Sequence, residues 1–169
     1  MAVNRGKQFE NVIRESFLAV TNTSVYRLHD DMSGFYGASN VSDFIIYHYP
    51  YQYFIECKAV HGNTLSINSN DPKRKYGNIS NTQWEGMLEL SKVNGVKAGV
   101  ICWFVDHDIT VFIPIQALQE WREQGHKSVR FDDGLNTDLE CYSIACEKKR
   151  VFFEYDMKKF FERFNNDSK

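Results

Sequence analysis

Three charged side chains interrupt two neighbouring apolar runs of the sequence. Asp43 opens the first run, and Glu56 and Lys58 lie inside the second, residues 53–60. Burying such charges costs desolvation energy, which a bound ion or ligand can offset. Two carboxylates supply the hard oxygen ligands that a divalent cation prefers, and an ammonium group beside them suits a phosphate. The residue types therefore predict a divalent-cation site with a phosphate-binding group next to it.

A β-hairpin would bring these side chains together. Residues 43–47 and 53–60 are apolar and are joined by a turn that contains proline, which predicts two paired strands. Neighbouring side chains of a strand point to opposite faces, so Glu56 and Lys58 should share one face while the residues between them face a core. Asp43, near the start of the first strand, can reach the same place.

The remaining elements are predicted from hydrophobic periodicity and from turn residues. Apolar residues at helical spacing predict helices at residues 6–20, 80–94, 114–124 and from 156 onward. Short apolar runs predict further strands at residues 25–28, 97–105, 109–113, 139–145 and 151–155. Residues 61–80 are polar and rich in Gly and Asn, which predicts a long loop. The order of elements predicts an α/β fold in which helices flank a mixed β-sheet, with a strand and helix appendix at the C-terminus.

Composition narrows the class of protein. The 169 residues are 43% hydrophobic, enough for one domain over residues 1–169, with a core at about 4–125 and an extension at about 126–169. The net charge of −2 excludes a globally basic nucleic-acid coat, so any nucleic-acid surface must be a local patch. The sequence has neither an apolar leader nor a long apolar run, which predicts a cytoplasmic protein without membrane contact. The cysteines form no Cys-x-x-Cys pair and are predicted to be reduced: Cys57, Cys102, Cys141 and Cys146.

The spacing of the charged residues resembles a known nuclease core. Asp43, twelve intervening residues and then Glu56-Cys57-Lys58 follow a helix that carries Glu10. This arrangement resembles the PD-(D/E)xK, or restriction-endonuclease-like, superfamily. A lone Glu-x-Lys triplet is common by chance, but the preceding helix and the apolar strands around the triplet make the pattern more specific.

Within that superfamily the chain is most similar to the RecU-like Holliday junction resolvases of Gram-positive bacteria and their phages. Three local matches carry the likeness, which spans about residues 4–113: Asn4-Arg5-Gly6 with Phe9-Glu10, the spacing from Asp43 to Lys58, and Gln83-Trp84-Glu85-Gly86-Met87. The chain departs from the family in a shorter connection over residues 29–42 and in an expanded loop over residues 61–79. Val41 also replaces the family's hydroxyl residue two positions before the aspartate. These departures concern junction specificity more than nuclease chemistry.

The resemblance implies a Mg²⁺- or Mn²⁺-dependent endodeoxyribonuclease that resolves four-way DNA junctions by paired symmetric nicks in recombination and repair. Two symmetric nicks imply a homodimer. The implied catalytic residues are Glu10, Asp43, Glu56, Lys58 and Gln83. Asp43, Glu56, the backbone carbonyl of Cys57 and the side-chain amide of Gln83 would hold the metal. Lys58 would orient the attacking water, and Glu10 would accept a hydrogen bond from a metal ligand or complete a second metal shell.

DNA contacts are expected from two groups of cations. Arg5, Lys7 and Arg14 lie on or next to the first predicted helix, and Lys73, Arg74 and Lys75 form a triplet in the long loop. Neutralising phosphates releases counterions, so binding should weaken with salt. Tyr76 follows the triplet and is expected to stack on an unpaired or distorted base.

Each assignment has a simpler alternative. Glu56 and Lys58 can be a salt bridge on a solvated sheet face, Gln83 can complete a capping box with Ser80, and Glu10 can be a surface carboxylate. The triplet can be a solvated loop, and the C-terminal aromatic residues can belong to a dimer surface or to the core. His29-Asp30 suggests an HD-type phosphohydrolase, but the other histidines lack the helical spacing that this class needs. The alternative functions are a non-catalytic DNA-junction-binding protein and a restriction- or repair-type nuclease with another target.

Overall fold

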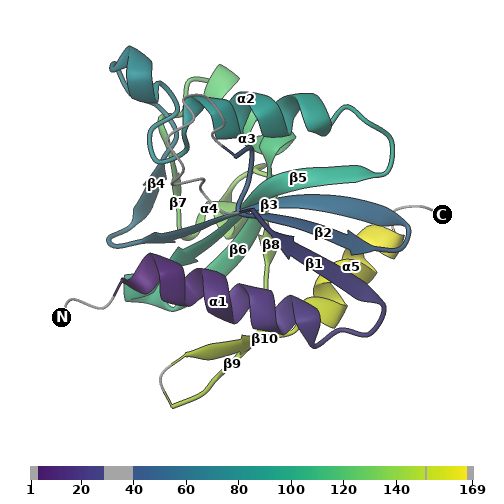
Figure 1. The fold of residues 1–169 in the computed structure, drawn as a ribbon. Coiled ribbons are helices and arrows are strands. Elements are labelled where there is room, and N and C mark those ends of the chain that lie inside the picture. Colours follow the sequence, from purple (N-terminus) through teal and green to yellow (C-terminus); the bar gives the residue numbers. More distant parts are fainter. Residues whose placement is uncertain (1–3, 29–39, 151, 167–169) are drawn as a thin grey trace, which may run out of the picture.

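The fold is built around a six-stranded mixed β-sheet. The computed structural model describes residues 4–28, 40–150 and 152–166 (Figure 1), so His29-Asp30 lies outside the described residues. The strands follow the spatial order β1 (Thr23–Arg27), β2 (Phe44–His48), β3 (Tyr51–Val60), β5 (Val96–Phe104), β6 (Ile109–Pro114) and β8 (Tyr142–Ser143). Strands β3 and β5 are parallel and are connected through α2 (Asn81–Leu90), while the other neighbouring pairs are antiparallel. The predicted hairpin is β2–β3, and the predicted mixed sheet is confirmed.

Helices cover both faces of the sheet. Helices α1 (Arg5–Leu18) and α5 (Met157–Asn166) lie on one face, and α2 and α3 (Ile115–Glu123) lie on the other (Figure 1). Helix α1 forms where the sequence predicts it, because Asn4 caps its first turn and Phe9, Ile13 and Phe17 are buried at four-residue spacing. Both faces of β3 are therefore covered, and Glu56 is only 2% exposed.

The C-terminal residues complete the core and do not form an appendix. Phe160, Phe161 and Phe164 of α5 are buried, and each ring contacts Tyr53 of β3. Strand β8 adds to the central sheet, and β9 (Cys146–Lys148) pairs with β10 (Phe153–Tyr155) beside α1. The choice between core and dimer surface is thus settled for these aromatic side chains, which lie in the core.

The prediction of an irregular loop over residues 61–80 is wrong in part. Strand β4 (Thr64–Ser66) pairs with β7 (Ser128–Arg130), and a 3₁₀ turn, η1 (Pro72–Arg74), follows. Leu65, Ile67 and Ile79 are fully buried in the α2–α3 core. The local composition is polar, but these three apolar residues pack against elements that come much later in the chain.

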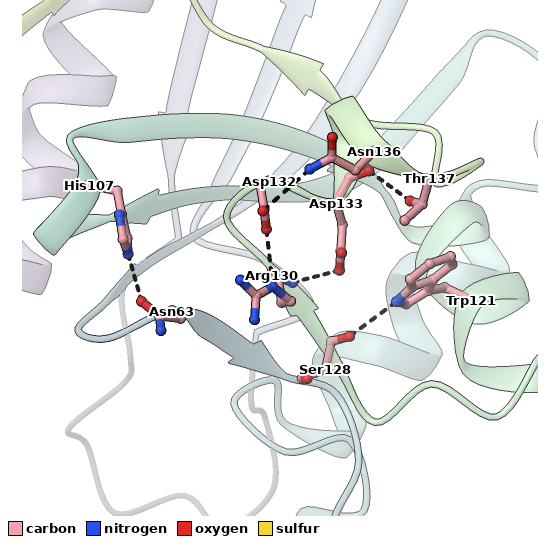
Figure 2. A network of polar contacts seen from close by, with 9 residues as sticks. All are labelled: Asn63, His107, Trp121, Ser128, Arg130, Asp132, Asp133, Asn136 and Thr137. Atoms are coloured by element: carbon pink, nitrogen blue, oxygen red, sulfur yellow. Dashed lines mark hydrogen bonds and ion pairs between the residues drawn. The ribbon is translucent and has the colours of Figure 1, made fainter.

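Polar contacts fix the β4–β7 ribbon to the body of the protein. Figure 2 shows a hydrogen bond of 2.7 Å between His107 Nε2 and Asn63 Oδ1, and another of 3.1 Å from Trp121 Nε1 to the carbonyl of Ser128. The first joins the turn after β5 to the residue that precedes β4, and the second joins α3 to β7. Residues around α4 (Asp133–Asn136) hold the far end of β7 through Arg130. The ribbon is therefore held at several separate points.

Two further sequence predictions concern cysteines and membrane contact. All four cysteines are free, and Cys57 and Cys102 are buried. Among the described residues, no helix combines the length and the apolar character that crossing a membrane requires.

Gly99 at the centre of β5 is expected to tolerate no side chain. A Cβ atom there would lie 2.4 Å from the carbonyl oxygen of Ile113 and 2.7 Å from the ring of Phe112. Gly99→Ala should therefore lower the free energy of unfolding by about 3 kcal/mol, measured by urea denaturation. Gly6→Ala in α1 is the control, because its Cβ would meet only Asn4 Oδ1 at 3.4 Å, and it should gain up to about 1 kcal/mol. Equal effects of the two substitutions would contradict the close packing at Gly99.

Candidate active site

Asp43 lies where the pairing of β2 with β3 ends. Its backbone N–H donates to the carbonyl of Ile55 at 3.0 Å, and its carboxylate Oδ2 accepts the backbone N–H of Cys57 at 2.7 Å. The Asp43 side chain thus accepts the hydrogen bond that a backbone carbonyl would accept if the β2–β3 ladder continued. The carbonyl of Cys57 points to the same side of β3 as its N–H, so it faces the region beyond the end of β2, as the predicted metal ligand should.

Glu56 is a buried carboxylate with only one of its oxygens satisfied. Oε1 lies 2.7 Å from Lys58 Nζ, whereas Oε2 is buried without a hydrogen-bond partner among the described residues. A salt bridge with Lys58 is therefore present, as the simpler alternative expected, but it does not lie on a solvated sheet face. Leaving a charged oxygen buried and unpaired is costly, and a cation at Oε2 would remove that cost.

The charge of Glu56 opposes the ionisation of Asp43. Burial, followed by the charge of Glu56, raises the pKa of Asp43 to about 7, although the N–H of Cys57 acts in the opposite direction. Burial also raises the pKa of Glu56, while Lys58 lowers it. At neutral pH without a bound cation, a proton on Asp43 partly neutralises the negative charge of the carboxylate pair. A divalent cation could replace that proton, so the donor set fits Mg²⁺ or Mn²⁺.

Glu10 reaches the same region from α1 but is paired with Arg27 of β1. The two side chains form a partly buried ion pair, at 19% and 30% exposure. Burial and the charge of Asp43 raise the pKa of Glu10, and Arg27 lowers it. The simpler assignment of Glu10 as a solvated carboxylate is therefore wrong. Sequence reasoning missed Arg27, whose only signal was its place in the strand before the hairpin.

Gln83 takes part in both of the arrangements that the sequence left open. Its backbone N–H donates to Ser80 Oγ at 3.2 Å, and its Oε1 accepts the backbone N–H of Ser80 at 3.1 Å. These two bonds form a capping box at the start of α2. Gln83 also lies beside Glu56 in the cavity, and its side chain partly offsets the rise in the pKa of Glu56 that burial causes. Because an amide oxygen has two lone pairs, Oε1 can accept the hydrogen bond from Ser80 with one and still coordinate a metal ion with the other.

One open cavity of about 570 Å³ connects these side chains. Three carboxylates and three cations line it together with neutral polar groups: Glu10, Asp43, Glu56, Lys7, Arg27, Lys58, Asn40, Ser42, Cys57 and Gln83, with Leu28. All five predicted catalytic residues therefore share one concavity at the end of the sheet. Ser42, which the sequence did not single out, is buried and donates to the carbonyl of Phe44 at 3.0 Å.

The predicted DNA-contacting residues are divided between this cavity and other surfaces. Lys7 lines the cavity, and Arg5, two residues earlier on α1, is exposed. Arg14 is bonded to its neighbour Glu15 at 2.6 Å. The triplet Lys73, Arg74 and Lys75 precedes α2 and does not line the cavity.

The prediction that Tyr76 stacks on a base is wrong. The side chain is only 6% exposed, and its ring stacks on Trp84 with 4.6 Å between centroids and 3° between planes. Both residues belong to the α2–α3 core. An aromatic residue beside three cations resembled a binding surface in the sequence, but the chain folds back and buries it.

A metal ion in this cavity would have few negatively charged side chains as ligands. Within residues 4–28, 40–150 and 152–166, no three His, Cys, Asp or Glu side chains are grouped so as to hold a metal ion. Asp43 and Glu56 would therefore need the neutral oxygens of Gln83 and Cys57, as the sequence predicted. Glu10 has its charge compensated by Arg27, which leaves it in a supporting position.

Comparisons with known proteins include a distant likeness to a solved structure. No protein-family profile matches the sequence, and no curated protein matches it. Among solved structures, the chain is similar to Hjc, a Holliday junction resolvase from the archaeal hyperthermophile Archaeoglobus fulgidus. The sequences are 16% identical, the TM-score is 0.46, and the similarity covers 66% of this chain and 78% of that chain.

Proposed function

We propose that the protein is a metal-dependent DNA endonuclease whose active site is the cavity around Asp43 and Glu56. The observation that carries the proposal is the buried carboxylate pair, with an unsatisfied Glu56 Oε2 and a lysine ammonium in contact with Glu56. A structural ion pair would have no need of a second carboxylate whose pKa is raised to about 7. A phosphodiesterase site needs all of these groups.

Each group in the cavity has a role in this reaction. Asp43, Glu56, the carbonyl of Cys57 and Gln83 would hold Mg²⁺ or Mn²⁺, which supplies Lewis acidity and a better nucleophile at neutral pH. Lys58 orients the attacking water and stabilises negative charge on the phosphoryl oxygens. The N–H of Cys57 fixes the Asp43 carboxylate. Arg27 holds Glu10 at the cavity wall, where Glu10 can accept a hydrogen bond from water.

The substrate class follows from the sequence resemblance. We infer four-way DNA junctions as the target and a homodimer that places two such cavities on opposite strands, in recombination or repair of a bacterium or its phage. Exposed cations near α1 and before α2 provide local positive charge on a chain of net charge −2. Binding should therefore be local and salt-dependent.

Cleavage of a labelled synthetic junction and of a duplex with the same sequence tests the proposal. With Mg²⁺ or Mn²⁺, the purified protein should nick the junction symmetrically, and Lys58→Ala, checked for folding by circular dichroism, should not. Equal nicking of junction and duplex would refute a resolvase and indicate a nuclease with another target. A protein that binds junctions but cuts no DNA with either ion would instead be the non-catalytic junction-binding protein.

Ser80→Ala and Gln83→Ala should separate the two roles of the capping box. Ser80→Ala removes the side-chain acceptor of the cap and is expected to cost about 1 kcal/mol of stability while changing cleavage little. Gln83→Ala removes the reciprocal bond and also the contact with Glu56, so cleavage should fall by about 10- to 100-fold. Thermal unfolding and single-turnover cleavage measure the two effects. Equal cleavage by both variants would leave Gln83 a capping residue alone.

A further inference from the structure

The segment Pro72–Tyr76, here called the basic arm, projects from the body of the protein just before α2. In Figure 1 its short helical turn stands out beyond the N-terminal end of α2, beside β4. Asp71 caps this turn by accepting the backbone N–H of Lys73 at 2.9 Å. The turn is therefore a defined structure and not an extended loop tip.

The base of the basic arm is anchored in the core through Tyr76. Its ring stacks on Trp84 of α2 at 4.6 Å, and the guanidinium of Arg122 from α3 lies 5.0 Å from the same ring. The hydroxyl of Tyr76 donates to Glu85 Oε1 at 3.1 Å. Two helices therefore hold one side chain of the arm, so the arm cannot swing without opening the core.

Backbone contacts hold both ends of the basic arm. Asn81 Nδ2 donates to the carbonyl of Pro72 at 2.9 Å, and Asn78 exchanges two hydrogen bonds with the backbone of Ser66 in β4. Gly77 has φ +65° and passes so close to Ser66 that a Cβ atom would lie 2.6 Å from its carbonyl oxygen. Strand β4 is itself fixed through β7 by the contacts in Figure 2. The arm therefore has a single supported conformation.

The three cations of the basic arm have different surroundings. Lys75 Nζ lies 3.1 Å from Glu85 Oε1 and 4.7 Å from the centroid of the Tyr76 ring. The Lys73 and Arg74 residues are exposed, and neither side chain forms an ion pair with a described residue. Lys75 thus supports the arm, whereas Lys73 and Arg74 are exposed to solvent on a backbone that the contacts above hold in place.

We propose that the basic arm is a preformed phosphate-binding element in which Lys73 and Arg74 bind the DNA backbone, while Lys75 is a structural support. This inference rests on the proposed function and deepens it. Asn81, which holds Pro72, is two residues from Gln83 at the cavity, a rise of about 3 Å along the helix axis. The arm therefore holds the bound backbone at a set position relative to Asp43 and Glu56, which determines the phosphodiester that enters the cavity.

The first test measures binding without cleavage. Affinity for a labelled junction is measured in EDTA over a range of salt concentrations. Lys73→Ala/Arg74→Ala should make the negative slope of log affinity against log salt shallower by about 1.8, because two phosphates lose their partners. Lys75→Ala should leave the slope unchanged. Lys92→Ala/Lys158→Ala removes two exposed lysines elsewhere and is the matched control, which should bind like the parent protein.

The second test measures whether the basic arm is preformed. The backbone N–H groups of Gly77 and Asn78, bonded to Arg74 and Ser66, should exchange slowly with deuterium before DNA is added and should change little afterwards. In Mg²⁺, the double variant should also cut the junction at more positions than the parent protein.

The outcomes separate this inference from the proposed function. If the parent protein cuts DNA but Lys73→Ala/Arg74→Ala keeps the parental slope, the arm inference is overturned and the nuclease stands. Fast exchange that becomes slow only with DNA overturns the preformed arm. If the parent neither binds nor cuts DNA, both proposals fail.

Discussion

Asp43→Asn is expected to abolish DNA cleavage and to make the metal-free protein more stable. Asn can still accept the N–H of Cys57, but it cannot supply a negative oxygen to a cation, so cleavage should fall by about 10³-fold. The substitution also removes a buried charge beside Glu56. Because the pKa of Asp43 is raised to about 7, the gain in unfolding free energy at pH 8 should be about 2–4 kcal/mol. Single-turnover cleavage and urea denaturation in EDTA measure the two effects.

A second aspartate provides the control of opposite sign. Asp106 accepts the backbone N–H of Gly62 at 2.6 Å, and this bond with the His61 contact lowers its pKa. Asp106→Asn should therefore lower stability and leave cleavage unchanged. If Asp43→Asn instead lowered stability and still cut DNA, Asp43 would be a structural residue. A gain in stability with lost activity is the pattern of a functional site that is maintained at the expense of the fold.

The central part of the fold could be predicted because its signals are local. Two apolar runs define β2 and β3, and the turn between them sets their register, so Asp43 had to lie near Glu56. The helical spacing of Phe9, Ile13 and Phe17 similarly places α1. These patterns depend on neighbours in sequence, and they located the predicted catalytic residues at one cavity.

The surroundings of that cavity could not be predicted because they depend on distant contacts. Arg27 meets Glu10 only after β1 pairs with β2 and α1 packs on the sheet. Tyr76 is buried because α2 and α3 supply Trp84 and Arg122 on either side of the chain. Hydrophobic periodicity in the sequence does not predict such contacts. The sequence therefore identified the proposed catalytic groups better than the groups that position them.

The stability of the metal-free protein is expected to fall as pH rises from about 4 to about 7. The pKa of Asp43 is raised from 3.8 to about 7, so the folded state binds its proton more tightly than the unfolded chain does. Below pH 3.8 both states are protonated and the full stability is present; as pH rises to 7, up to about 4 kcal/mol is lost. Glu56, whose pKa is also raised, acts in the same direction.

Partly exposed carboxylates act in the opposite direction at lower pH. The pKa values of Asp132 and Asp156 are lowered by their hydrogen bonds, to Arg130 and Lys159 respectively, and these groups add stability as they ionise. Their contribution is complete by about pH 5. Between pH 5 and 7 Glu10, whose pKa is raised, and His48, whose pKa is lowered by burial, also contribute. The difference between the parent protein and Asp43→Asn therefore isolates the contribution of Asp43.

A divalent cation should reverse this loss of stability, because it binds the ionised pair of the folded state and not the protonated one. At a concentration 100 times its dissociation constant, the ion should add about 2.7 kcal/mol. The increase in melting temperature caused by Mn²⁺, relative to EDTA, should therefore be large at pH 8, small at pH 5 and absent in Asp43→Asn. A stabilisation that is equal at both pH values, or that persists in Asp43→Asn, would place the ion elsewhere and leave the buried carboxylate pair without the partner that its geometry requires.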